Sequence, residues 1–415
     1  MLQVGSAQVF GRVVSDRTCA EWLGALPGTW TPAMDVTDTR GARVASVWRD
    51  ERGGMFLPFD PDELIMNCWS EAYLSAGPGT LARRAVRKGL PLYYRARPAL
   101  PRGVQITARR AAARVQARVR FPRWPIETSL QDLYSFMFDC LHTLVQQPVP
   151  YLAAWPDGRA WALVLTHDVE TLAGCELLGA LRGIESELGL RSSWNFVPLR
   201  YDVDPKLLGD LQRDGFEVGV HGLYHDGFDV ASLDTLRERA PLMRQYAERW
   251  NAVGFRSPAT RRVWEFMPLL GFDYDSSYPD TDPYEPQAGG CCSWLPFFNE
   301  ELVELPITLP QDHTLFVILG KEDESLWVEK ADFLRGRGGM ALALTHPDYV
   351  HAEPLLGHYE RFLRRFCDDS TGWHPLPREV SSWWRRRAKS RPVLVRGSWR
   401  VEGPAAREGR VAFHG

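Results

Sequence analysis

The stretch Trp161-Ala-Leu-Val-Leu-Thr-His-Asp-Val-Glu170 decides the fold, because an apolar run typical of a buried strand ends there in acidic groups. A second such run, Glu217-Val-Gly-Val-His221, ends in a histidine, and His225 follows four residues later. Polar side chains directly after buried strands are typical of the sheet edge at which α/β proteins bind ligands. An acid and two imidazoles are the donor set of an open hydrolytic metal site.

Strand-like and helix-like segments take turns along the chain from Ala160 onward. This order predicts parallel strands with helical crossovers, either as an open doubly wound sheet or as a barrel. In both architectures the reactive groups gather beyond the carboxyl ends of the strands. The polar residues at such predicted ends, each on a different strand, are Asp168, His221, Arg256, Asp275 and His346.

Three parts are expected along the 415 residues. Residues 1–155 form a mixed α/β amino-terminal region of unassigned role, in which Arg114–Phe121 alternates like a strand. A group of prolines and a glycine marks its end. Residues 156–390 form the domain with alternating elements, and residues 391–415 form a short tail or hairpin.

The composition, 45% hydrophobic and 24% charged, is that of an ordinary globular protein. There is no apolar run of about 18 residues and no secretory signal, so we expect no transmembrane segment and a cytoplasmic location. Seven cysteines without a Cys-x-x-Cys pair argue against a disulfide framework and against a thiolate zinc site. The chain also lacks a Gly-x-Ser-x-Gly elbow and a glycine-rich phosphate loop, which sets aside serine hydrolases and nucleotide-binding enzymes.

The segment 72–126 is locally very basic, because thirteen Lys or Arg and no Asp or Glu lie between Ala72 and Ile126. One interpretation is an anionic surface partner, such as an anionic polymer, a membrane surface or nucleic acid. The other is a solvated face whose arginines are balanced by acids from elsewhere in the fold. No nucleic-acid-binding motif accompanies the segment, so a specific nucleic-acid partner is not expected.

Four short motifs occur in a fixed order: Thr166-His-Asp-Val-Glu170, the pair His221 and His225, Arg256-Ser-Pro258 and Leu344-Thr-His346. In this order they resemble the polysaccharide deacetylases, the NodB-homology group of the carbohydrate esterase 4 type. The resemblance covers about residues 160–350 and implies a distorted (β/α)7-type barrel. It also implies a metal-dependent hydrolase that removes N-acetyl groups from an amino sugar in a polysaccharide or glycan precursor.

The first motif departs from the family pattern Thr-Phe-Asp-Asp-Gly, in which the second Asp binds the metal. Val169 occupies that position here and cannot bind a cation. Either Glu170 or Asp168 must then join His221 and His225 as the acid ligand of one divalent metal ion, for which zinc is the first choice. Alternation along an extended chain places Asp168 and Glu170 on the same side.

The resemblance also implies the catalytic roles. Asp168 is expected to be the general base and His346 the general acid, while Arg256 orients Asp168 and keeps it ionised. Asp275, in the least clear of the motifs, is expected to tune His346.

Two further residues are assigned to the N-acetylated carbohydrate substrate. Trp294 is expected to line a sugar-binding wall, and His313 to border the pocket.

Two other functions remain open at this stage. A small-amide or ureide hydrolase of the allantoinase-like type would keep the scaffold and the C–N hydrolysis but change the substrate. A catalytically silent glycan-binding protein would follow if Val169 marked a lost metal site.

Overall fold

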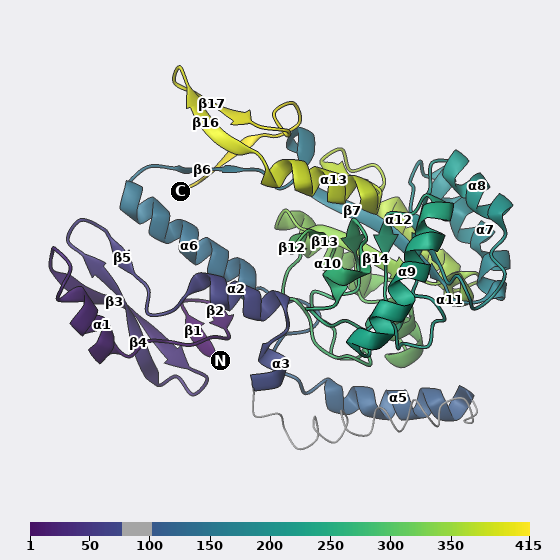
Figure 1. Cartoon of the computed structure of the whole chain (residues 1–415), viewed down its shortest axis with the longest axis horizontal. Coiled ribbons are helices and arrows are strands. Elements are labelled where there is room, and N and C mark those ends of the chain that lie inside the picture. Colours follow the sequence, from purple (N-terminus) through teal and green to yellow (C-terminus); the bar gives the residue numbers. More distant parts are fainter. Residues whose placement is uncertain (77–101) are drawn as a thin grey trace.

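The computed structural model describes residues 1–76 and 102–415. Figure 1 shows an amino-terminal sheet at one end of the molecule and a barrel at the other, with helix α6 (Ser129–Val145) running between them. The expected fold class, a distorted (β/α)7-type barrel with an additional mixed α/β amino-terminal region, is confirmed.

An antiparallel sheet with the strand order β2-β1-β3-β4-β5 organises the amino-terminal region. Its apolar face packs Val36 and Val47 against Leu64 and Leu133, which come from two helices. The elements of this region are β1 (Leu2–Val4), β2 (Ala7–Val9), α1 (Asp16–Leu23), β3 (Trp30–Asp38), β4 (Arg43–Asp50), β5 (Met55–Phe56), α2 (Pro61–Trp69), α3 (Tyr73–Ala76), α5 (Arg102–Gln116), α6 and β6 (Val149–Leu152).

Parallel pairings build the barrel wall in the order β14, β7, β8, β9, β10, β11 and β13. The strands are β7 (Trp161–Val169), β8 (Ser193–Phe196), β9 (Glu217–Val220), β10 (Gly254–Phe255), β11 (Tyr274–Asp275), β12 (Phe297–Asn299), β13 (Leu302–Glu304), β14 (Met340–Thr345) and β15 (Gly372–Trp373). Strand β12 lies antiparallel on β13, and β15 pairs with the start of β7.

The barrel closes through single contacts rather than through a continuous ladder. Beyond β13, Leu309 N donates to Leu342 O at 3.0 Å, and Leu342 N donates to Thr308 Oγ1 at 2.7 Å. Part of the closed wall is therefore a segment without regular secondary structure, which agrees with a distorted barrel.

Crossover helices follow most of the strands, and their starts are set by capping residues. The side chains of Thr171, Asp204 and Ser232 each accept a backbone N–H in the first turn of the helix that follows. The helices are α7 (Leu172–Glu187), α8 (Pro205–Arg213), α9 (Leu233–Trp250), α10 (Ser325–Gly336), α11 (Pro347–Val350), α12 (Leu355–Phe366) and α13 (Pro377–Ala388). Short turns of other helix types are η2 (Pro156–Gly158), η3 (Pro258–Thr260), η4 (Met267–Leu270) and the π-helix η5 (His313–Ile318).

Strand β7 is buried over its whole length. Leu163 and Leu165 belong to one hydrophobic cluster of the barrel domain, whereas Ala162 and Val164 belong to another. This burial on both faces explains the continuous apolar run in the sequence. It also places the acidic residues that end the run at the carboxyl-terminal end of β7.

The alternation of Arg114–Phe121 does not form the strand that the sequence predicts. Most of the segment continues or follows helix α5, in which alanine and arginine are favourable residues. Ala113 and Gln116 are buried on one side of this helix, while Arg114 is exposed on the other. A short period-2 pattern is therefore outweighed by helix propensity and by packing on one face.

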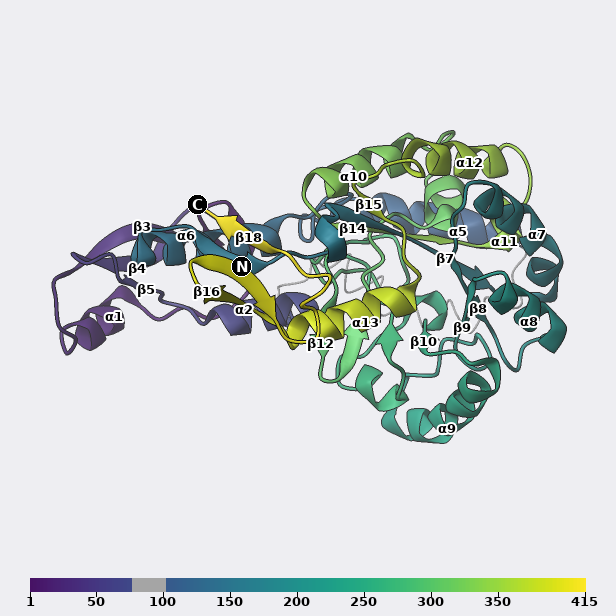
Figure 2. The ribbon, with the colours of Figure 1, turned by 90° about the horizontal axis from the view of Figure 1, so that it is seen from above.

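The last residues form a hairpin of β16 (Arg391–Val395) and β17 (Ser398–Glu402), followed by β18 (Val411–His414). Strand β18 pairs antiparallel with β6, so the end of the chain lies beside the segment that enters the barrel (Figure 2). No helix among the described residues is both long enough and apolar enough to cross a membrane. Residues 77–101 of the basic segment lie outside the described residues.

Candidate active site

Four of the polar residues expected at strand ends lie together at the carboxyl-terminal end of the barrel. Asp168 is the last residue but one of β7, and His221, Arg256 and His346 directly follow β9, β10 and β14. All four are buried. Parallel pairing brings the strand ends to one rim of the barrel, so residues far apart in the sequence meet there.

Asp168 is held as an oriented carboxylate. Its Oδ1 accepts hydrogen bonds from Asn195 Nδ2 at 2.9 Å and from Arg256 Nη1 at 3.2 Å. Arg256 is itself fixed because its Nε donates to Ser276 O at 2.7 Å. Burial opposes ionisation of Asp168, but the charge of Arg256 and the hydrogen bond from Asn195 favour the ionised form, and the pKa of this carboxyl is lowered. The other oxygen, Oδ2, lies 3.6 Å from His221 Nε2.

His221 presents a lone pair to the site. Its Nδ1 lies 3.0 Å from Arg256 O, and because a carbonyl only accepts, Nδ1 carries the proton. Burial lowers the pKa of His221 to about 4, so the ring is neutral near pH 7. The unprotonated Nε2 is buried and finds no hydrogen-bond partner among the described residues. A buried nitrogen without a partner is costly unless it binds something, and a metal ion is the usual acceptor of such a lone pair.

Glu170 and His225 lie beside this nitrogen. Glu170 Oε1 is 2.9 Å from His225 Nε2, while the Nδ1 of His225 contacts Arg200. Val169, between Asp168 and Glu170, points the other way and packs into the hydrophobic core. Val169 is thus a core residue, and the acidic side chains on either side of it face the site.

The donor atoms of Glu170, His221 and His225 fit a divalent cation. One ligand atom from each residue lies within 4.8 Å of the other two. Zinc holds histidine nitrogen and carboxylate oxygen at about 2.0–2.2 Å, so ligand atoms around one ion are up to about 4 Å apart. Metal binding would replace the hydrogen bond between His225 and Glu170.

His346 faces the same group of residues from β14. Its Nε2 lies 3.8 Å from Glu170 Oε1, and its Nδ1 lies 2.7 Å from Oδ1 of the buried Asp312. The other oxygen of Asp312 accepts the backbone N–H of His346 at 2.8 Å. Burial alone would lower the pKa of His346, but the carboxylates of Asp312, Glu170 and Asp168 raise it to about 10. The imidazole is therefore a protonated group aimed at the site.

Asp275 is not the partner of His346, which corrects the role expected for it. It pairs in register with Glu304 of the neighbouring strand β13, and its Oδ1 accepts from Ser277 Oγ at 2.6 Å. Burial raises the pKa of both Asp275 and Glu304, and each carboxyl opposes ionisation of the other. The acid that tunes His346 is Asp312, which comes from the chain beyond β13.

Trp294 does not line the site, so the expectation of a sugar-binding wall there is wrong. Its side chain is only 4% exposed and packs edge-on against Phe333. Its carbonyl accepts the backbone N–H of Met340, the first residue of β14. Because β14 runs from Met340 to the residue before His346, Trp294 lies at the opposite end of the barrel.

His313 lies close to His346. Its ring centroid is 5.1 Å from that of Tyr349, which in turn is 5.5 Å from that of His346. Burial lowers the pKa of His313. His313 therefore lies near His346, and its place at the border of a substrate pocket stays a prediction.

Sequence reasoning missed two residues of this site, Asn195 and Asp312. Asn195 is paired in register with Asp168, so a polar residue near the end of the next strand was a signal that could have found it. Asp312 directly precedes His313 in a stretch with several polar groups. Its role depends on the contact with His346, which no local pattern reveals.

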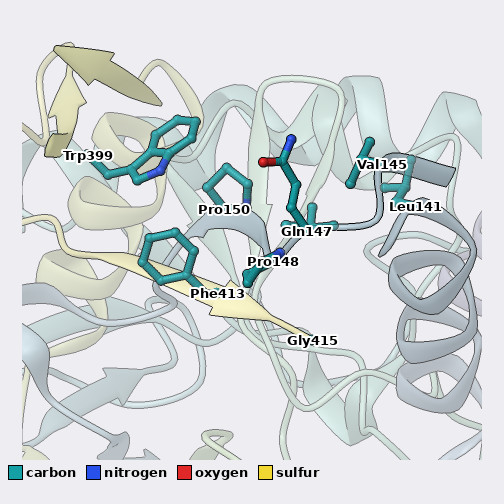
Figure 3. Close-up of a pocket in the computed structure, with 9 residues that line it drawn as sticks. Leu141, Val145, Gln147, Pro148, Pro150, Trp399, Phe413 and Gly415 are labelled. Atoms are coloured by element: carbon teal, nitrogen blue, oxygen red, sulfur yellow. The ribbon is translucent and has the colours of Figure 1, made fainter. Parts of the chain in front are cut away.

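A separate cavity of about 560 Å³ lies away from these residues. It opens between the end of α6, strand β6 and the carboxy-terminal strands, with Trp399 and Phe413 on one side and Leu141 and Val145 on the other (Figure 3). None of the site residues named above lines it.

No family model matches the chain, and no curated protein matches it. Solved structures do. The chain is similar to polysaccharide deacetylases. One of these structures is described as a polysaccharide deacetylase from Mycobacterium smegmatis. It is 20% identical to this chain with a TM-score of 0.48, and the match covers 61% of this chain and 100% of the other. A peptidoglycan deacetylase from Bacillus subtilis is 11% identical with a TM-score of 0.36, over 55% and 93%. An allantoinase is 15% identical with a TM-score of 0.46, over 64% and 98%.

Proposed function

We propose that this protein is a metal-dependent hydrolase that removes the N-acetyl group from an amino sugar of a glycan or glycan precursor. The observation that carries the proposal is the arrangement around His221 Nε2. This unpartnered nitrogen lies 3.6 Å from the carboxylate of Asp168, with Glu170 beside it and the protonated His346 opposite. Amide hydrolysis needs a base and an acid on the two sides of one bond, and these residues supply both.

Glu170, His221 and His225 would hold the divalent ion, for which zinc suits two imidazoles and a carboxylate. When bound there, such an ion polarises an amide carbonyl and lowers the pKa of a water molecule. Three protein ligands leave room for substrate and water. Glu170 is favoured over Asp168 as the acid ligand because Asp168 Oδ1 is already used by Asn195 and Arg256.

Asp168 acts as the general base. Arg256 and Asn195 hold one of its oxygens and leave Oδ2 directed at the space beside His221. From there Oδ2 takes a proton from water as the water oxygen attacks the acetyl carbonyl carbon. The lowered pKa keeps Asp168 ionised, so it is ready to accept that proton at neutral pH.

His346 acts as the general acid. Asp312 fixes the proton on Nδ1, and the surrounding carboxylates keep the ring protonated on Nε2 as well. When the C–N bond breaks, Nε2 gives its proton to the departing amine nitrogen. The products are acetate and the free amino sugar, and no oxidant or further reactant is needed.

Metal analysis of five proteins tests the proposal. We expect the wild type to bind one equivalent of zinc, and His221→Ala and Glu170→Gln to bind none. Asp168→Asn should keep the metal but lose activity by about 10²–10⁴-fold, because only the base is removed. His142→Ala, on helix α6 outside the site, is the matched control and should bind metal as the wild type does. If Asp168→Asn loses the metal and Glu170→Gln keeps it, the assignment of the acid ligand is reversed.

Product analysis separates the two enzymatic alternatives. Acetate should appear from N-acetylated oligosaccharides such as tetra-N-acetylchitotetraose, whereas a small ureide such as allantoin should be left unchanged. Turnover of the ureide alone would replace the proposal with the ureide hydrolase. A wild-type protein that binds no zinc, and whose glycan binding is unaffected by Asp168→Asn, would show a silent glycan-binding protein instead.

A further inference from the structure

Large apolar side chains are exposed around the cavity that lies away from the proposed active site (Figure 3). Trp399 and Phe413 from the carboxy-terminal strands and Leu141 and Val145 from the end of α6 line this cavity, and each is between 39% and 49% exposed. Leu394 is opposite Trp399 in the hairpin register, so it lies on the same side of the hairpin, and it is 58% exposed. We call these five residues the apolar face. Such a group of side chains marks a surface that binds a partner.

The hairpin of β16 and β17 carries part of the apolar face away from the body of the molecule. Figure 1 shows this hairpin projecting beyond the barrel and the amino-terminal sheet. Arg396 and Gly397 form its two-residue turn, and both have the positive φ that such a tight turn requires. Trp399 follows the turn closely and meets Phe413 edge-on, with ring centroids 6.4 Å apart. A projecting turn of this kind can reach an extended surface before the rest of the molecule does.

Positive charge without compensation surrounds the tip of the hairpin. Arg396 and Arg400 are exposed, and neither forms an ion pair with any residue that the structure describes. Residues 391–415 contain five arginines and two acids. Both acids, Glu402 and Glu408, already form ion pairs with arginines, at 3.3 and 2.8 Å. The apolar face is therefore bordered by free cations, and its charge is complementary to that of an anionic partner.

Apolar side chains bordered by arginines suit a membrane surface better than a nucleic acid or a neutral glycan. In a membrane, apolar groups enter the boundary between headgroups and acyl chains, tryptophan lies at that boundary, and arginines contact anionic headgroups. The cavity has a volume of about 560 Å³, and its described lining contains no charged side chain, so it can take up a hydrocarbon group. A nucleic acid would leave Leu141 and Leu394 in water. A neutral glycan would leave the arginines without a partner.

The carboxy-terminal segment lies at the end of the barrel opposite to the catalytic residues. Trp155 Nε1 donates to Gly338 O at 2.9 Å, shortly before β14 begins, and Arg387 Nε donates to Ala153 O at 3.0 Å. These contacts hold the segment beside the start of β14, whereas His346 follows the end of that strand. A membrane bound at the apolar face would therefore leave the barrel rim open to a substrate.

We propose that the apolar face, together with Arg396 and Arg400, is a docking surface for a membrane that contains anionic lipids. The apolar side chains enter the boundary of the acyl chains, and the two arginines contact the phosphate groups of the lipids. The inference is independent of the proposed hydrolase activity, because none of these residues belongs to the site at the barrel rim.

Flotation of the whole chain with lipid vesicles tests the inference. We compare vesicles of phosphatidylcholine alone with vesicles in which about 30% of the lipid is phosphatidylglycerol. In low salt we expect the anionic vesicles to be bound about tenfold more tightly or better, and the difference to shrink as the salt concentration rises. Arg396→Gln/Arg400→Gln should weaken binding to the anionic vesicles by about tenfold. Trp399→Ala, which removes an apolar side chain without a change of charge, should weaken it by a similar factor of about ten.

Matched controls remove exposed side chains of the same kinds elsewhere. Arg40→Gln/Arg52→Gln changes two exposed arginines in turns of the amino-terminal sheet, and Trp22→Ala changes an exposed tryptophan on α1. Both controls should bind the vesicles as the wild type does. Thermal unfolding checks the fold of each variant. If Trp399→Ala is less stable, the arginine variant decides, because its two side chains form no ion pair with described residues.

Three results overturn the inference: no binding to the anionic vesicles, equal binding to both kinds of vesicle, or an equal loss of binding in the controls. A dimer that Trp399→Ala dissociates, in a protein that binds no vesicles, would show that a second copy of the chain covers the apolar face instead. Acetate release from tetra-N-acetylchitotetraose by the zinc-loaded wild type keeps the two proposals apart. Vesicle binding without acetate contradicts the deacetylase function and leaves the docking surface standing, and acetate without vesicle binding does the reverse.

Discussion

The tautomer of His221 depends on one backbone carbonyl. Because Arg256 O accepts a hydrogen bond from Nδ1–H, Nε2 carries the lone pair and directs it into the site. The same residue, Arg256, uses its guanidinium to hold Asp168. One residue therefore orients a proposed metal ligand through its main chain and the proposed base through its side chain.

Replacing Asp312 tests how His346 is oriented. Asp312→Asn removes the charge that raises the pKa of His346 but leaves a side chain of similar size. We expect kcat of the deacetylation to fall by about 10²-fold or more with little change in KM, because the acid acts only as the C–N bond breaks. Steady-state kinetics on the zinc-loaded variant measure this. Asp332→Asn, on the outer helix α10, is the control, and an equal effect of both variants would contradict the role of Asp312.

The residues that a sequence can reveal in such a site are those at strand ends. Asp168, His221 and His346 were found because each ends a buried run, and the structure brings them together. Asp312 could not be found in this way, because it lies beyond β13 in irregular chain. Its importance comes from a contact with a residue 34 positions away.

At the scale of the element, the neighbouring strands β11 and β13 carry a buried pair of carboxyls. Asp275 and Glu304 are opposite each other in register, and the backbone N–H groups of Ser277 and Tyr278 donate to Glu304 Oε1 at 3.1 and 3.0 Å. Burial and the partner carboxyl raise the pKa of Glu304 well above its ordinary value. The folded protein therefore binds a proton here that the unfolded chain releases near pH 4.5.

This proton makes stability depend on pH. A raised folded-state pKa gives a contribution that is complete below the unfolded pKa of 4.5 and is lost as the pH rises through the folded pKa. The loss amounts to about 1.4 kcal/mol per pH unit within that window. Glu304→Gln keeps the carbonyl acceptor and never ionises, so its free energy of unfolding should fall less between pH 5 and pH 8. Urea unfolding at both pH values measures this, and parallel losses in variant and wild type would contradict it.

Gly254 leaves room for the side chain of Tyr274, its partner on the neighbouring strand β11. A Cβ there would collide with the ring of Tyr274, whose hydroxyl donates to Glu217 Oε1 at 2.9 Å. Gly254→Ala should lower the free energy of unfolding by about 1–3 kcal/mol or more, through overpacking. Gly179→Ala, in helix α7 with open space around it, should be neutral or stabilising by up to about 1 kcal/mol. Thermal and denaturant unfolding compare the two, and equal effects would show that the contact with Tyr274 is not decisive.

The type of an element was predictable where burial and periodicity agreed, and not where the pattern was short. The run Trp161–Val169 could only be a buried strand, and it is one. Arg114–Phe121 gave a period of two over a few residues, but the first three of them end helix α5 and the others follow it without regular structure. Whether such a segment becomes a helix or a strand depends on its packing against η5, and the local sequence does not contain that information.

At the scale of the whole molecule, aromatic side chains attach the amino-terminal region to the barrel. Trp69 stacks on Phe297 of β12 with ring centroids 4.9 Å apart, and Tyr73 donates its hydroxyl to Gly290 O at 2.5 Å. The sequence predicted a boundary near residue 155 but gave no sign of these contacts. Long-range packing between two parts of a chain leaves no periodic pattern in either of them.

A buried ion pair also links the two parts. Glu71, between α2 and α3, accepts from Arg262 Nη2 at 2.6 Å and from Nε at 2.8 Å, and the side chains are 4% and 0% exposed. Arg262 follows η3 and lies six residues beyond Arg256 of the site. Removing one partner of such a pair leaves a buried charge without compensation.

Glu71→Ala should therefore lower the free energy of unfolding by about 3–5 kcal/mol. Glu63→Ala is the matched control, since Glu63 pairs with Arg12 at 3.0 Å on the surface, where the Arg12 side chain is 90% exposed. The control should cost less than about 1 kcal/mol. Urea unfolding of both variants, followed by tryptophan fluorescence, gives the comparison. Similar losses in the two would mean that the amino-terminal region is held to the barrel by its apolar contacts, with the Glu71–Arg262 pair contributing no more than a surface ion pair does.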